Sequence, residues 1–167
     1  MIQVPERLIY RYLDTNGDGT GTKNAVGNYT TETEFFIAPG LAYQYGLHRM
    51  IVSIQDASGS SAAEYGNIGS ALTNGIKISV IDSSDNELLD LTDGLPIKTN
   101  AEWAAACYDD TLNTWGQGNE LFAIRWTFTK DSGDPLLIKP GNRFSVVLND
   151  DLTGLVSHKF FVRGKII

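Results

Sequence analysis

Residues 47–54 read Leu47-His48-Arg49-Met50-Ile51-Val52-Ser53-Ile54. Apolar and polar character changes with a period of two along this stretch, as in a strand whose two faces meet different surroundings. Such a strand has His48, Met50, Val52 and Ile54 on one face and Leu47, Arg49, Ile51 and Ser53 on the other. We expect the face that contains Met50 and Val52 to be buried.

Short segments of the same kind recur along the chain and are separated by corners rich in Gly, Asn, Asp and Pro. Residues 7–13 form the first, with Leu8, Tyr10 and Tyr12 on one side and Arg7, Ile9 and Arg11 on the other. Others occupy residues 34–37, 76–81, 87–91, 121–129, 136–138, 144–148 and 159–166. The five turn formers 82–86 predict a hairpin between the segments 76–81 and 87–91.

One segment favours a helix. Asn100 can cap a helix over Ala101–Tyr108, whose alanines favour that conformation. Trp103, Ala106 and Cys107 at positions i, i+3 and i+4 would form its buried stripe.

These patterns predict an all-β fold, a jelly-roll-like β-sandwich of about nine strands and one short helix. The length of 167 residues suits a single domain, 1–167, in which 1–5 can form an N-terminal arm. One cysteine cannot form an internal disulfide, so Cys107 is expected to be a small buried side chain.

The first residues lack the basic start and apolar core of a secretion signal, and no window of about eighteen apolar residues follows. We therefore expect synthesis in the cytoplasm and no membrane partner. A net charge of −7 argues against nucleic acid as a partner, because such binding depends on Lys and Arg at the phosphates. The charge is uneven, because residues 78–124 hold nine acids and one base, a net −8.

The loop Asp14-Thr15-Asn16-Gly17-Asp18-Gly19 places oxygen side chains at alternate positions before a glycine. Calcium loops use this spacing, so Asp14, Asn16 and Asp18 are candidate ligands for Ca²⁺, the one cofactor that the sequence suggests. The twelfth position is Ala25 rather than a bidentate carboxylate. The alternative is a turn that these side chains stabilise by bonding to the backbone.

Catalytic residue types are sparse, and we expect no enzymatic activity. The two histidines, His48 and His158, fall in expected strands, where a core or interface role is typical. Asp150 and Asp151 are neighbours that would point to opposite faces of a strand. A turn over residues 149–154 explains both carboxylates.

Trp115 lies in the glycine-rich loop 115–118 and, with Tyr108, could form a shallow aromatic site. Such rings stack on sugars or anchor protein interfaces. The alternative function is therefore a carbohydrate- or receptor-binding module at a tail or head-fibre tip, assisted by calcium in the first loop. A Trp packed over a glycine corner is the purely structural explanation.

Four stretches, at residues 10–21, 72–76, 90–94 and 148–158, together resemble small β-rich virion structural proteins of tailed bacteriophages. The resemblance implies a non-enzymatic virion protein of the head decoration or cement type. It also implies a homo-oligomer, for instance a trimer, that binds the major capsid protein or other virion proteins and stabilises the particle. The apolar ends, with Ile2 and Val4 at one and Ile166 and Ile167 at the other, are the candidate contact arms.

Overall fold

The structure is a computed structural model that describes residues 7–56, 72–92, 107–109, 121–127 and 133–167. These residues form antiparallel strands and no helix. In chain order the strands are β1 (Arg7–Tyr12), β2 (Thr33–Ile37), β3 (Tyr45–Asp56), β4 (Ile76–Ile81), β5 (Glu87–Asp90), β6 (Cys107–Asp109), β7 (Leu121–Thr127), β8 (Leu136–Ile138), β9 (Arg143–Leu148) and β10 (Leu155–Ile166).

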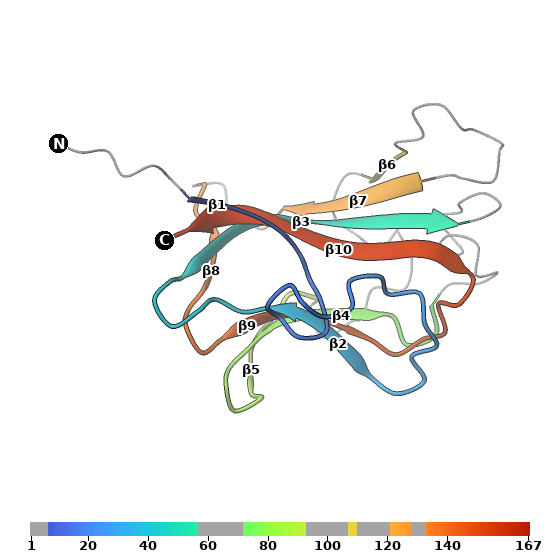
Figure 1. Ribbon diagram of the computed structural model, residues 1–167, viewed down its shortest axis with the longest axis horizontal. Coiled ribbons are helices and arrows are strands. Elements are labelled where there is room, and N and C mark those ends of the chain that lie inside the picture. Colours follow the sequence, from blue (N-terminus) through green and yellow to red (C-terminus); the bar gives the residue numbers. More distant parts are fainter. Residues whose placement is uncertain (1–6, 57–71, 93–106, 110–120, 128–132) are drawn as a thin grey trace.

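Two sheets lie one above the other and enclose the core (Figure 1). The first has the order β1-β10-β3-β7-β6, and β8 also pairs with β3. The second has the order β2-β9-β4-β5. The all-β sandwich expected from the alternating segments is confirmed.

The strand pairs are nested from the chain ends inward. β1 pairs with β10, β2 with β9, β3 with β7 and β4 with β5. The chain is thus one long antiparallel hairpin, and the contacts of β10 with β3 and of β9 with β4 roll it into two layers. This is the strand order of a jelly roll, as predicted.

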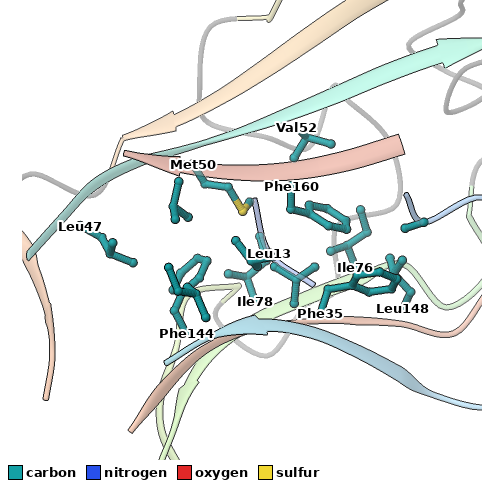
Figure 2. Packing of buried hydrophobic residues seen from close by; sticks show 14 of the residues in the cluster. Leu13, Phe35, Leu47, Met50, Val52, Ile76, Ile78, Phe144, Leu148 and Phe160 are labelled. Carbon is teal, nitrogen blue, oxygen red and sulfur yellow. The ribbon is translucent and has the colours of Figure 1, made fainter. Parts of the chain in front are cut away.

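Large side chains from both sheets meet between the layers (Figure 2). Phe35 comes from β2, Met50 and Val52 from β3, Phe144 from β9 and Phe160 from β10, and all five are fully buried. Burial of this apolar surface is the main favourable term in folding, at roughly 25 cal/mol per Å².

A β-bulge corrects the predicted faces of β3. Arg163 pairs with Arg49 but Gly164 pairs with Leu47, so His48 is an extra residue in the ladder. The bulge restarts the alternation, which buries Leu47 completely and leaves His48 half-buried. The expectation that His48 shares the inner face with Met50 is therefore wrong.

The predicted helix over Ala101–Tyr108 is wrong at its C-terminal end. Cys107 and Tyr108 belong to β6, where they pair with Ile124 and Ala123 of β7. Pairing with a neighbouring strand overrides the local helix propensity of the alanines. Residues 101–106 lie outside the described residues.

The predicted β4–β5 hairpin is confirmed. Asp82 closes its turn: the amides of Ser84 and Asn86 donate to Asp82 Oδ1 at 2.8 and 2.9 Å. Asp85 takes a φ of 62° in this turn, which Asp tolerates better than most residues.

Candidate binding surface

The apolar side of β1 points away from the core. Leu8, Tyr10 and Tyr12 are 75, 69 and 41% exposed, whereas Ile9 and the following Leu13 are buried. The alternation of residues 7–13 predicts a half-buried strand but does not state which side is buried. In the structure the inner side is the one with Ile9, so the sandwich displays two tyrosines and a leucine.

The exposed tyrosines form a ring cluster with β10. Tyr12 pairs with Phe161 and Tyr10 with Arg163 across the two strands. The ring of Phe161 lies 4.1 Å from that of Tyr10 and 5.0 Å from that of Tyr12, both edge to face. Phe161 is only 7% exposed although it points outward, because the tyrosines cover it.

Cations surround these rings. The guanidinium of Arg163 lies 5.1 Å from the centre of the Tyr10 ring, and Lys159 Nζ lies 5.9 Å from that of Tyr12. Each such contact contributes about 0.5–1 kcal/mol at an exposed site. Arg49 pairs with Arg163, and Lys165 pairs with Leu8.

We call this surface the β1–β10 face. Because directly paired residues point to the same side of a sheet, its outward residues are Leu8, Tyr10, Tyr12, Gly46, Arg49, Ile51, Ser53, Lys159, Phe161, Arg163 and Lys165. They include four bases and no acid. Sequence analysis missed this surface; the signal was the cation at every second residue around Phe161, together with Tyr10 and Tyr12.

The first loop is a turn held by its own side chains. Asp14 is buried, and the amides of Asn16 and Gly17 donate to its Oδ1 at 2.8 and 2.6 Å. The amide and hydroxyl of Thr20 donate to Asp18 Oδ1 at 2.8 and 2.6 Å, which lowers the pKa of Asp18. Asn16 Nδ2 donates to the Thr20 hydroxyl.

A cation from the protein already lies at this loop. Arg11 Nη2 donates to the carbonyl of Gly17 at 3.3 Å, and its charge also favours ionised Asp18. Among the described residues no three His, Cys, Asp or Glu side chains are grouped as metal ligands. The geometry matches the turn alternative, and calcium binding by Asp14, Asn16 and Asp18 stays a prediction.

Asp150 is a structural clamp. Its carboxylate accepts hydrogen bonds from three successive amides: Thr73 at 2.7 Å, Asn74 at 3.0 Å and Gly75 at 2.9 Å. It is nearly buried and ties the entry of β4 to the turn after β9. The predicted turn at residues 149–154 is confirmed, because the amide of Leu155 donates to the carbonyl of Leu152 and Thr153 donates to Asp151.

Replacing Asp150 with alanine should lower the free energy of unfolding by about 2–4 kcal/mol, since hydrogen bonds to a charged group contribute about 1.5–3 kcal/mol and the amide of Gly75 is left buried. Urea denaturation measures the loss. Asp151→Ala, at the exposed neighbouring carboxylate, is the matched control and should cost under about 1 kcal/mol. Equal losses in the two variants would contradict the clamp.

The two histidines lie in the sheet rather than in a solvent-exposed site. His158 is fully buried, its Nδ1 lies 3.1 Å from the carbonyl of Ala25, and its ring packs against Phe160 at 4.8 Å. Burial lowers the pKa of His158 to about 4, against the opposing effect of the Ala25 carbonyl. Such an imidazole is neutral at pH 7 and cannot reach a substrate in solvent. His48 occupies the bulge.

The remaining candidates are in part outside the described residues. Ile2, Val4 and Trp115 lie there, and so does the side chain of Tyr108. Ile166 pairs with Arg7 and Tyr45 and packs against the core. The amide and carbonyl of Ile167 both bond to Gln44, so the C-terminal backbone is held in the sheet although the Ile167 side chain is 53% exposed.

No helix of the described residues is long and apolar enough to cross a membrane. Comparison of the chain with protein-family models, with curated proteins and with solved structures finds no match in any of the three. The β1–β10 face is the candidate binding surface of the described residues.

Proposed function

We propose that the chain is a non-enzymatic structural protein of a tailed-bacteriophage virion, a decoration or cement protein that binds neighbouring capsid subunits. The resemblance of four stretches to such proteins motivates the proposal. The jelly-roll sandwich supports it, because this fold is common among proteins of viral particles. Fold alone does not imply function, so the proposal depends on a surface that is built for contact.

The observation that carries the proposal is the outward position of Tyr10 and Leu8 on β1, at 69 and 75% exposure. Exposed apolar clusters rimmed by charge mark interaction sites on soluble proteins. Tyrosine and arginine are enriched among the residues that dominate interface energies, and Tyr10 stacks with Arg163 here.

A decoration protein of this kind acts through mass action. It binds the assembled shell and not the separated subunits, so it stabilises the shell by RT ln(1 + [L]/Kd), about 2.7 kcal/mol at a hundredfold excess over Kd. No reacting group is needed, and a folded sandwich with one adhesive outer surface is sufficient.

The test uses particles purified from the virus or lysogen that carries this gene. We expect quantitative mass spectrometry to find the chain at a fixed ratio to capsid subunits or vertices. Particles made without it should release DNA at a lower temperature, and added wild-type protein should restore the release temperature. Tyr10→Ser should restore it less well than Leu41→Ser, which changes an exposed leucine that is not one of the residues of the face. Absence of the chain from purified particles would contradict the proposal.

A second candidate is the carbohydrate- or receptor-binding module. The exposed rings of Tyr10 and Tyr12 favour it, because amphipathic rings also stack on sugars. A glycan array gives the test. This candidate predicts binding that Tyr10→Ser or Trp115→Ala abolishes and that chelation weakens, with no association of the chain with particles.

A further inference from the structure

The β1–β10 face is suited to an acidic partner. Its outward residues include Arg49, Lys159, Arg163 and Lys165 and no acid, on a chain whose net charge is −7. Tyr10, Tyr12 and Leu8 lie beside these cations. A matching surface therefore presents carboxylates around exposed apolar side chains.

The β4–β5 hairpin presents that combination. Residues 82–90 contain the four acids Asp82, Asp85, Glu87 and Asp90 and no base. Lys77 binds Glu87 at 2.6 Å, and Arg143 binds both Asp85 at 2.8 Å and Glu34 at 2.6 Å. With Glu34 included, five acids against two bases leave a net charge of −3. Between the carboxylates, Leu88 is 54% exposed at the irregularity of the β4–β5 ladder, whereas Leu89 pairs with the buried Val80.

The two surfaces of one chain cannot meet each other. The β1–β10 face is the outer side of the first sheet and points away from the second. β5 is the edge strand of the second sheet, and its hairpin extends away from the body of the sandwich (Figure 1). A contact between hairpin and face must therefore join two molecules.

We infer that the β1–β10 face of one copy binds the β4–β5 hairpin of a second copy. Leu88 packs on the tyrosine cluster, and the hairpin carboxylates lie among Lys159, Arg163 and Arg49. Because the two patches differ, the contact is head to tail, and it builds a ring when the rotation closes and an open chain when it does not. The inference deepens the proposed function, on which its role in a particle rests.

The first measurement is sedimentation velocity on the purified full chain. We expect reversible self-association at low salt that weakens several-fold between about 50 and 500 mM NaCl, because exposed charges are screened. The face variant Tyr10→Ser/Arg163→Glu and the hairpin variant Leu88→Lys should each raise Kd at least about tenfold. Lys139→Glu and Leu41→Lys make the same chemical changes at exposed positions elsewhere and should leave Kd unchanged.

A mixing experiment separates this contact from any symmetric one. The face variant keeps an intact hairpin, and the hairpin variant keeps an intact face. Mixed at equal concentration, they should form a one-to-one heterodimer that grows no further, while each alone stays folded and monomeric. A mixture that stays monomeric would overturn the inference.

Two other outcomes would also overturn it. One is a wild-type chain that is monomeric at about 1 mM and low salt, where even weak interfaces form. The other is a monomeric chain whose β1–β10 face binds a single-stranded oligonucleotide in an anisotropy assay, with loss of binding in the face variant. Neither result bears on the proposed function, which is decided by the presence of the chain in particles.

Discussion

Replacing Gly164 with alanine should destabilise the protein by about 3 kcal/mol or more, the upper end for overpacking. A Cβ atom at this position would lie 2.1 Å from the carbonyl oxygen of Gly46 and 2.9 Å from the Cα of Leu47. Both atoms belong to the backbone of β3, which cannot move without disturbing its ladders to β8 and β7. The bulge at His48 lies directly beside this close approach.

Urea denaturation followed by tryptophan fluorescence measures the effect. Gly40→Ala is the matched control, because its Cβ would meet only Tyr43 at 3.9 Å and its φ is not positive. We expect that variant to change the free energy of unfolding by under about 0.5 kcal/mol. A loss below about 1 kcal/mol for Gly164→Ala would show that β3 and β10 can separate without cost.

Acid should destabilise the protein through His158. Its pKa is lowered from 6.5 to about 4 in the folded protein, so the unfolded chain binds a proton first as the pH falls. The stabilisation is therefore complete above about pH 6.5 and is lost as the pH falls towards 4. At about 1.36 kcal/mol per unit, the loss reaches about 3 kcal/mol.

The pH dependence is measured as the free energy of unfolding at pH 7, 6, 5 and 4 in the wild type and in His158→Gln. The variant should lose stability at pH 7 but should show a flatter slope between pH 6.5 and 4. Leu41→Ser, a substitution at an exposed non-titrating side chain, is the control and should keep the wild-type slope. Parallel curves for wild type and His158→Gln would assign the acid sensitivity to carboxylates instead.

The strands could be predicted because each one obeys a local rule. The segment 76–81 alternates and is bounded by Asn74-Gly75 and by the polar turn 82–86, and it forms β4 between those limits. The run 136–138 before Pro140-Gly141 forms β8. Period-two burial and turn chemistry are properties of neighbouring residues, so one sequence is sufficient to recognise them.

The candidate sites were less predictable. The sequence around Asp150 does not indicate that its carboxylate accepts hydrogen bonds from the amides of residues 73–75, because these lie about 75 positions away along the chain. The carboxylates of the first loop predicted a cation site. In the structure they accept hydrogen bonds from backbone amides three or fewer residues away. The spacing of the loop carboxylates fits both a cation site and a self-stabilised turn, and only the folded geometry distinguishes the two.

The sequence by itself determined the class of fold, the hairpin at residues 82–86 and the strand segments, because alternation and turn residues act over a few positions. The tertiary structure decided which side of each strand is buried. Leu47 rather than His48 is inside because a bulge opposite Gly164 shifts the register. Tyr10 is outside because it pairs with Arg163 of β10, 153 residues later, in the register that buries Ile9. A slip of one residue exchanges the two faces of a strand, and only long-range pairing fixes that choice.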